Sequence, residues 1–122
     1  GLDLIHLVAP TSTPDRMRTI ARVSRGFLYM VSLTGVTGAR AELSVELSQH
    51  LRTLRGITTK PICVGFGIST PAQAEAVGSV ADGVIVGSAI VQLIERYATS
   101  SELVAQVGDF VASLKQPLRS RA

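Results

Sequence analysis

Gly87 and Ser88 are the residues whose types and position could do chemistry most directly. They follow the apolar run 84–86, whose β-branched residues are typical of a strand buried on both faces, and they precede a predicted helix. Glycine lets a ligand approach the backbone closely, and the first N–H groups of a helix have no acceptor within it. Together with the Ser88 hydroxyl and the positive end of the helix dipole, these groups predict a phosphate-binding turn.

Two more loops of this kind follow earlier apolar runs. Gly65-Phe66-Gly67 comes after the predicted strand 61–64, and its glycines again permit close approach of a ligand. Residues 32–40 follow the predicted strand 27–31 and form a connection longer than the ~2–6 residues usual between a strand and a helix. Two glycines and three hydroxyl side chains predict that this segment is a closing or ligand-binding loop; a merely flexible connection is the alternative.

Four short apolar runs alternate with helical patterns along the chain. This order predicts an α/β fold with a parallel sheet, four successive β/α units and right-handed crossovers. We expect residues 1–122 to form a single unit that begins within a fold, with a frayed tail at 116–122. The predicted strands are 4–8, 27–31, 61–64 and 84–86.

Polar residues and glycines predict where the helices begin and end. Thr13 and Thr70 are expected N-caps, and Thr99 to Glu102 is expected to form a capping box before the last helix. Gly26 and Gly56 are expected to end the first and second helices, because glycine readily adopts the left-handed conformation of a helix C-terminus.

Two architectures fit this order of elements. One is a small flavodoxin-like open sheet, and the other is half of a (β/α)8 barrel, whose full length is about 250 residues. The barrel explains more, because its phosphate site is built from the loops after the last two strands and a short extra helix. Here those parts are Gly65-Phe66-Gly67, Gly87-Ser88 and the predicted short helix 90–97.

Composition excludes several classes of protein. The mean hydropathy of +0.35 is high for a small domain, which indicates apolar surface that something outside the 122 residues covers. No apolar run reaches the ~20 residues of a membrane span, no signal-peptide pattern opens the chain, and one Cys excludes a disulfide framework. The single Cys fits a reducing compartment, so we expect a cytoplasmic protein. The net charge of +3 is spread over several helices, and we expect binding to neither nucleic acid nor membrane.

The titratable residues do not form an acid/base pair. Asp3 and Asp82 precede their strands and the other acidic residues lie on predicted helices, so none occupies the carboxyl end of a strand. His6 and Cys63 lie within apolar runs and are expected to be packed and inert. Tyr29 is the one titratable side chain near a strand carboxyl end. The residues therefore predict a phosphate site with no metal, no cofactor and no general acid or base.

Four stretches of the sequence carry a resemblance to a known family: 9–16, 26–38, 64–69 with Pro71, and 82–91. In this order they resemble the tryptophan synthase alpha chain family. The resemblance runs through nearly all of the 122 residues and corresponds to the C-terminal half of the family's (β/α)8 barrel, units 5 to 8. The family cleaves indole-3-glycerol phosphate to indole and glyceraldehyde 3-phosphate by a retro-aldol step.

The resemblance implies a role for particular residues. Gly38, Gly67, Gly87 and Ser88 would hold the substrate phosphate. Tyr29 would line the site beside a catalytic carboxylate, and Thr37 would help to position a catalytic Asp from the closing loop. The family's catalytic Glu and Asp lie in the first half of its barrel and neither is present here, so this chain has no catalytic residue of its own and is expected to be inactive alone.

The resemblance also implies partners. The tryptophan synthase beta chain would bind in an alpha2beta2 complex and would carry the pyridoxal phosphate, while the N-terminal half of the barrel would complete the fold. Open sheet edges predict self-association or pairing with that half. The alternatives are half of another phosphate-binding barrel, such as a sugar-phosphate isomerase or thiamin-phosphate synthase, and a non-catalytic phosphate-binding or interaction module.

Overall fold

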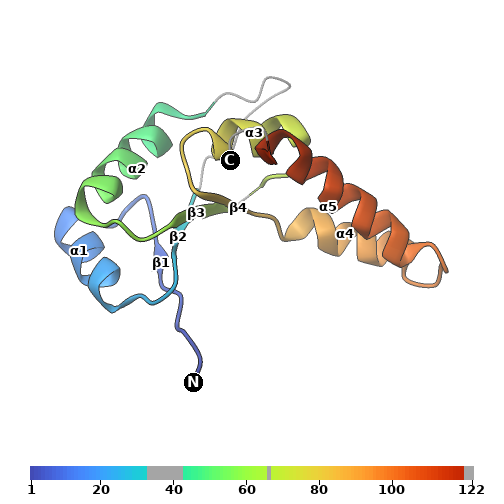
Figure 1. Ribbon diagram of the computed structural model, residues 1–122, viewed down its shortest axis with the longest axis horizontal. Helices are drawn as coiled ribbons and strands as arrows, with labels where there is room; N and C mark the ends of the chain where they lie inside the picture. The colour runs from blue at the N-terminus through green and yellow to red at the C-terminus, as the bar shows by residue number, and fades with distance from the viewer. Residues whose placement is uncertain (33–42, 66, 120–122) are drawn as a thin grey trace.

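The computed structural model describes residues 1–32, 43–65 and 67–119, which form a four-stranded parallel sheet and five helices (Figure 1). The strand order is β1-β2-β3-β4, so each crossover moves the chain one strand along the sheet. The elements are β1 (Leu7–Val8), α1 (Pro14–Val23), β2 (Leu28–Val31), α2 (Val45–Ile57), β3 (Ile62–Gly65), α3 (Pro71–Gly78), β4 (Gly83–Ile85), α4 (Ser88–Tyr97) and α5 (Leu103–Arg119).

Among the described residues, helices cover one face of the sheet and leave the other open. Successive side chains of a strand point to opposite faces, so the register decides which residues are covered. Val8, Met30 and Val64 lie in one row, are almost fully buried and pack in the core beneath the helices. The two rows on the opposite face are Leu7-Tyr29-Cys63-Gly83 and Val31-Gly65-Ile85.

The apolar run 4–8, which was predicted to be a strand, is only partly covered in this chain. Leu7 is 59% exposed and Leu4 67% exposed, although both belong to the predicted strand 4–8. Only Leu7–Val8 of that run is a strand. Val8 is covered because it faces the helices, while Leu7 faces the open side and has nothing packed over it within the described residues.

Helix starts follow the predicted capping chemistry. Thr13 accepts a hydrogen bond from the Arg16 N–H before α1, and Thr70 forms a full capping box with Gln73 before α3. The first residue of both helices is proline, which has no N–H to leave unsatisfied. Ser44, which was not among the predicted N-caps, caps α2 by accepting a hydrogen bond from the Leu47 N–H.

The first helix ends earlier than Gly26, contrary to expectation. Ser24 leaves the helical conformation while its N–H still donates to the Ile20 carbonyl. The Ser24 hydroxyl accepts from the His6 N–H at 3.2 Å, and Lys60 Nζ donates to the Ser24 carbonyl at 2.6 Å. These contacts stop the helix, and Gly26 has a φ of +80° in the loop that follows.

Two other predicted boundaries also move. Gly56 lies inside α2, because the helix continues until the Thr58 N–H donates to the Leu54 carbonyl. The predicted capping box at 99–102 does not form as expected, since it is the Ser100 hydroxyl that accepts a hydrogen bond from the Glu102 N–H. In both places a local hydrogen bond overrides the sequence signal.

Residues 116–119 of the predicted tail 116–122 are helical, contrary to expectation, and the rest of that segment lies outside the described residues. Helix α5 continues through Pro117 to Arg119. The Leu118 side chain contacts α3 at Gly78, where a Cβ atom would collide with it. Packing of Leu118 against the glycine therefore extends the helix beyond the point at which local sequence would end it.

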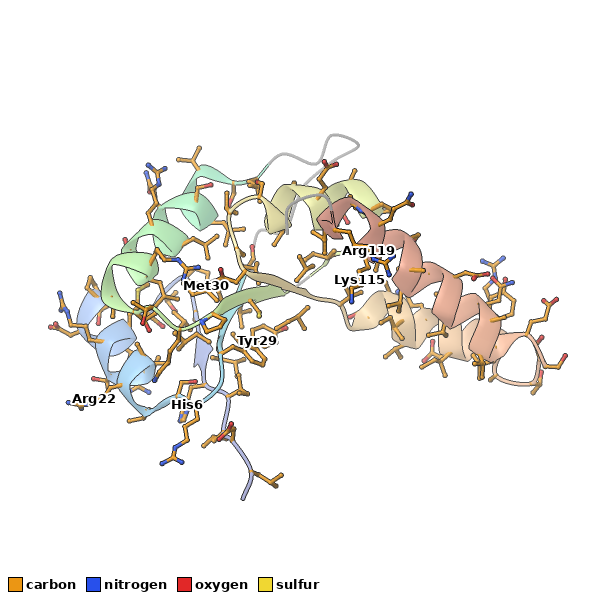
Figure 2. The ribbon with its side chains drawn as sticks, in the orientation of Figure 1. His6, Arg22, Tyr29, Met30, Lys115 and Arg119 are labelled. Atoms are coloured by element: carbon orange, nitrogen blue, oxygen red, sulfur yellow. The ribbon has the colours of Figure 1, made fainter. Side chains whose placement is uncertain are left out.

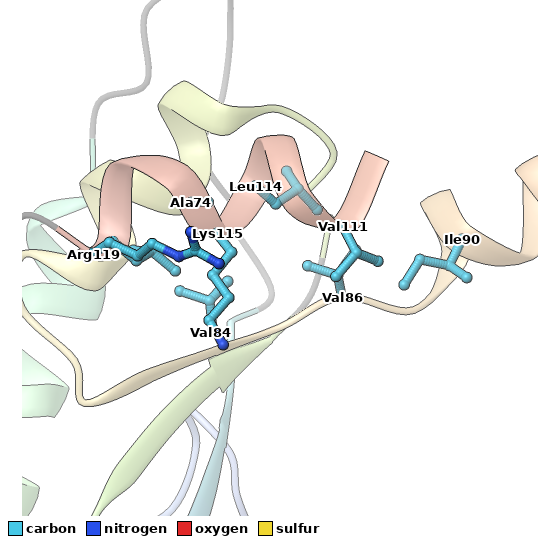
Figure 3. Close-up of a pocket in the computed structure, with 9 residues that line it drawn as sticks. Ala74, Val84, Val86, Ile90, Val111, Leu114, Lys115 and Arg119 are labelled. Carbon is cyan, nitrogen blue, oxygen red and sulfur yellow. The ribbon is translucent and has the colours of Figure 1, made fainter. Parts of the chain in front are cut away.

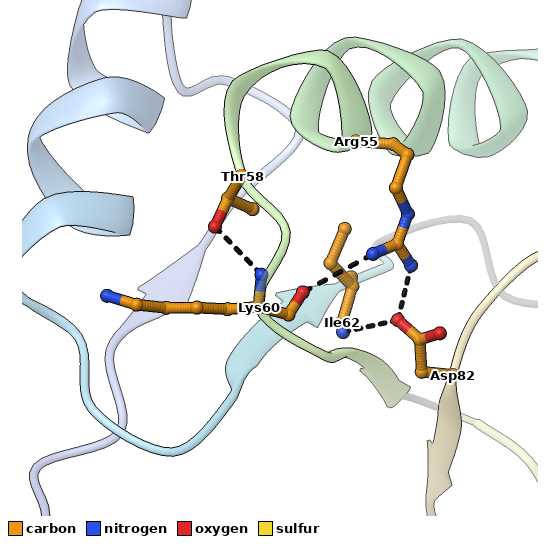
Figure 4. Close-up of polar contacts among 5 residues, drawn as sticks. All are labelled: Arg55, Thr58, Lys60, Ile62 and Asp82. Carbon is orange, nitrogen blue, oxygen red and sulfur yellow. Dashed lines mark hydrogen bonds and ion pairs between the residues drawn. The ribbon is translucent and has the colours of Figure 1, made fainter.

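Asp82 joins three segments at the amino ends of the strands (Figure 4). Its carboxylate is ion-paired with Arg55 of α2 and accepts the Ile62 N–H at 2.8 Å. Arg55 also donates to the Lys60 carbonyl at 3.3 Å. Burial raises the pKa of Asp82, but the hydrogen bonds from Arg55 and Ile62 and the charge of Arg55 outweigh it, so the pKa lies below its usual value.

We predict that Asp82→Ala lowers the free energy of unfolding at pH 7 by about 1–2 kcal/mol, because it removes a half-exposed ion pair and a backbone hydrogen bond. The folded pKa is lowered, so this contribution is present above the unfolded pKa and is lost as pH falls through the folded value, below about pH 4. Urea unfolding between pH 7 and pH 3 measures both effects. Asp15→Ala is the control, because the Asp15–Arg18 pair is well exposed and should contribute little.

Candidate phosphate-binding site

A pocket of about 330 Å³ lies at the carboxyl side of β2, β3 and β4. It contains Tyr29, Gly67, Gly87 and Ser88, four of the six residues singled out from the sequence. The other two, Thr37 and Gly38, lie outside the described residues. The strands are parallel neighbours, so the turns that follow them open at the same end of the sheet and their residues meet in one place.

The N-terminus of α4 supplies hydrogen-bond donors to this pocket. Gly87 is its N-cap, and its carbonyl accepts from the Ile90 and Val91 N–H groups at 2.9 and 3.1 Å. The N–H groups of Ser88 and Ala89 precede any possible acceptor within the helix, and both residues line the pocket. No side chain caps this end, within the described part of the chain, so the donors and the helix dipole are available to an anion.

Glycine keeps the floor of the pocket clear. Gly67 has a φ of +71°, which residues with a Cβ rarely adopt. Beyond its chain neighbours, a Cβ built on Gly67 or Gly87 would meet no atom of the described residues within 4 Å, so these residues leave the space beside each backbone open to a ligand. A ligand can therefore lie directly against the main chain at both turns.

The loop after β3 is held in shape by the capping box of α3. Gln73 Oε1 accepts from the Ser69 N–H at 2.8 Å, from the Ser69 hydroxyl and from the Thr70 N–H. These bonds fix the short segment between Gly67 and the helix. A capping motif that could be recognised from sequence as a helix start thus also shapes the binding loop.

Tyr29 reaches the pocket across Gly65. A Cβ on Gly65 would lie 2.5 Å from Tyr29 Oη and 2.9 Å from Ile85 Cβ. Tyr29 and Gly65 belong to neighbouring rows of the open face. Tyr29 lies on the side of β2 away from the helices (Figure 2). Glycine at position 65 therefore leaves the space that the tyrosine ring occupies.

The described residues that line this pocket carry no charge. Binding of an anion would depend on backbone N–H groups, the Ser88 and Ser69 hydroxyls and the helix dipole. His6 and Cys63 are not among the described residues that line the pocket. Burial and the charge of Asp82 raise the pKa of the Cys63 thiol, which makes it a poor nucleophile.

Sequence reasoning missed several residues of the pocket. Gln92 lies four residues after Ser88 on α4, and this helical spacing could have placed both side chains on one face. Ser69 stands in the loop after β3, two residues beyond Gly67. Ile85 reaches the pocket because strand register turns its side chain to the open face, and register cannot be read from a strand of three residues.

The family model for the tryptophan synthase alpha chain matches residues 1–119. The chain belongs to this family. The alpha chain of Geobacter sulfurreducens is 51% identical over 118 residues, which are 97% of this chain and 44% of the relative. That of Gloeobacter violaceus is 54% identical over 117 residues, 95% of this chain and 42% of the relative. The chain thus spans less than half the length of these alpha chains.

Solved structures of the family show the same fold. Tryptophan synthase subunit alpha of Legionella pneumophila superposes with a TM-score of 0.79 at 35% identity, over 98% of this chain and 44% of that one. A chain of the a2b2 complex of Pyrococcus furiosus superposes with a TM-score of 0.77 at 33% identity, over 93% of this chain and 46% of that chain. The prediction of four β/α units from the C-terminal half of an alpha-chain barrel is confirmed, and the flavodoxin-like alternative is set aside.

We predict that Gly65→Ala displaces the Tyr29 ring from the pocket, because the added methyl group would overlap Tyr29 Oη and Ile85. Overpacking of this kind costs about 1–3 kcal/mol in the free energy of unfolding. NMR of the tyrosine ring and urea unfolding measure the two effects. Gly108→Ala, where a Cβ meets open space on α5, should leave the ring signals unchanged. Unaltered Tyr29 signals in Gly65→Ala would contradict the proposed packing.

Proposed function

We propose that this chain is the phosphate-binding part of a tryptophan synthase alpha chain, a lyase that cleaves indole-3-glycerol phosphate to indole and glyceraldehyde 3-phosphate in tryptophan biosynthesis. One observation carries the proposal beyond family membership. Gly67, Gly87 and Ser88, from the turns after two neighbouring strands, share one pocket with the uncapped N-terminus of α4. Half of another phosphate-binding barrel is disfavoured by the match of residues 1–119 to this family.

The phosphate would sit against the two glycine turns. The N–H groups of Ser88 and Ala89 and the Ser88 hydroxyl would donate to its oxygens, and Gly67 and Gly87 would allow the approach. Gly38 is proposed to add a contact from the loop after β2. A neutral pocket with several N–H donors suits a dianion because each hydrogen bond to a charged oxygen is stronger than one to a neutral group.

The chemistry needs residues from outside this chain. Tyr29 is proposed to lie beside a catalytic carboxylate and Thr37 to help position another, both carboxylates coming from the first half of the family's barrel. The described residues that line the pocket include neither Asp nor Glu. The 122 residues would therefore hold the phosphate of the substrate without a group to move protons at the indole.

The proposed partner is the tryptophan synthase beta chain. The Pyrococcus furiosus relative was solved as an a2b2 complex, in a study of mutual activation. We propose that pyridoxal phosphate belongs to the beta chain and that the alpha chain uses no cofactor of its own. A cytoplasmic location is proposed with the family; within the described residues, no helix has the length and apolar character needed to cross a bilayer.

Gly87→Ala is predicted to weaken binding of glyceraldehyde 3-phosphate at least about 10-fold, because the new methyl group projects into the space that the phosphate needs. Ser88→Ala should lose about 3- to 10-fold through one hydrogen bond. Titration calorimetry or NMR of the 122-residue chain measures both affinities. Gly108→Ala is the matched control, since its Cβ also meets open space but lies on α5 away from the pocket. Equal affinities for all variants would contradict the assignment.

The purified 122-residue chain is predicted to release no indole from indole-3-glycerol phosphate. The described pocket lining has no carboxylate that could protonate the ring or accept a proton from the substrate. Colorimetric detection of indole measures this, with a complete alpha chain of a relative as the positive control. Turnover by the isolated chain would show that a group within it performs the proton transfer.

A further inference from the structure

Gln92 lines the phosphate pocket without a role in the proposed function. It belongs to α4, four residues after Ser88, and its side chain is exposed. Within the described part of the chain, its side-chain amide forms no hydrogen bond with another residue. An amide that faces a binding pocket and has no partner there can donate to a ligand and accept from it.

The rotation of α4 about its axis depends on Ile90. Ile90 lies with Val86 and Val111 at an apolar cavity of about 530 Å³, on the side of α4 next to β4 and α5 (Figure 3). Successive residues of an α-helix are about 100° apart, so residues two positions before and after Ile90 lie on the opposite side of the helix. The contact of Ile90 therefore turns Ser88 and Gln92 together toward the phosphate pocket, which both of them line.

Helix geometry also directs Gln92 to the end of α4 that carries the free donors. The Cα–Cβ bonds of a helix tilt toward its N-terminus, so a side chain covers the turn before its own Cα. Ser88 precedes Gln92 by one turn, which is about 6 Å along the axis. The Cα–Cβ bond of Gln92 therefore points to the end of the helix at which the N–H groups of Ser88 and Ala89 meet the pocket.

Gln92 differs from the other polar side chains of the pocket in what it can donate. Among the described residues that line the pocket, it has the only side-chain N–H groups, two on a neutral amide. The Ser69 hydroxyl is already engaged with Gln73 Oε1 at 3.2 Å. Because a phosphate group has three strong acceptor oxygens, it can use more donors than one helix N-terminus and the Ser88 hydroxyl supply.

We propose that Gln92 is a further phosphate-binding residue, whose neutral amide donates to a phosphate oxygen that the backbone N–H groups of α4 leave uncovered. The inference rests on the proposed function, because it takes the phosphate to lie against Gly87 and Ser88. The pocket then binds a dianion through neutral groups, and position 92 decides whether a charge is added to it. A charge introduced there changes the affinity in the direction of its sign.

Binding of inorganic phosphate and of glycerol 3-phosphate to the protein, purified at its native length, tests the inference. Gln92→Leu removes the amide at similar volume and should weaken binding of both ligands by the same factor, about 3- to 10-fold. Gln49→Leu is the matched control, because Gln49 is another exposed helical glutamine and lies on α2, outside the pocket lining. NMR titration or calorimetry gives the affinities, and the thermal midpoint shows that each variant is folded.

Charged variants at the same position give a second readout. Gln92→Glu should weaken binding of inorganic phosphate at least about 10-fold, because a carboxylate repels the dianion. Gln92→Lys should tighten binding at low ionic strength, and the gain should shrink as salt is added. Equal affinities of the two variants would overturn the placement of Gln92 beside the phosphate.

Two results with Gln92→Leu would also overturn the inference. One is wild-type affinity for inorganic phosphate. The other is a loss confined to glycerol 3-phosphate, because the amide would then bind a hydroxyl of the carbon chain. Ser88→Ala separates these results from failure of the proposed function. Weaker binding in Ser88→Ala with none in Gln92→Leu refutes only the role of Gln92, whereas wild-type affinity in both variants counts against the phosphate site as well.

Discussion

The parallel ladder of β2, β3 and β4 is the constraint on which the rest of the structure depends. Parallel strands bring all of their carboxyl ends to one edge, so turns that are separated by about twenty residues in the chain open side by side. Gly67 and Gly87 follow neighbouring strands, and Tyr29 lies on the third. The candidate site is therefore a consequence of strand order, and its glycines are useful only because that order places them together.

The two ends of the sheet differ in their chemistry. At the amino ends, Asp82 uses its charge to bind Arg55 and a backbone N–H, which joins α2, β3 and the start of β4. At the carboxyl ends, the pocket has no charged side chain among its described residues and leaves helix N–H groups without acceptors. Satisfied polar groups hold the fold at one end, while unsatisfied donors at the other are free to bind a ligand.

The covered and open faces of the sheet show why this chain has an unusual surface. Met30 and Val64 are buried by helices of the chain itself, whereas Leu7, on the alternate position, is 59% exposed and Ile85 is only partly buried by the described residues. The relatives of the family are more than twice as long as this chain.

The sequence by itself determined the four β/α units, the caps at Thr13 and Thr70, and the residue types of the binding turns, because these depend on local periodicity and hydrogen bonding. Tertiary structure decided the face to which each strand residue points, the place of Ile85 and Gln92 in the pocket, and the extension of α5 by Leu118. These features depend on register and on packing between segments distant in the chain, and no local pattern encodes either.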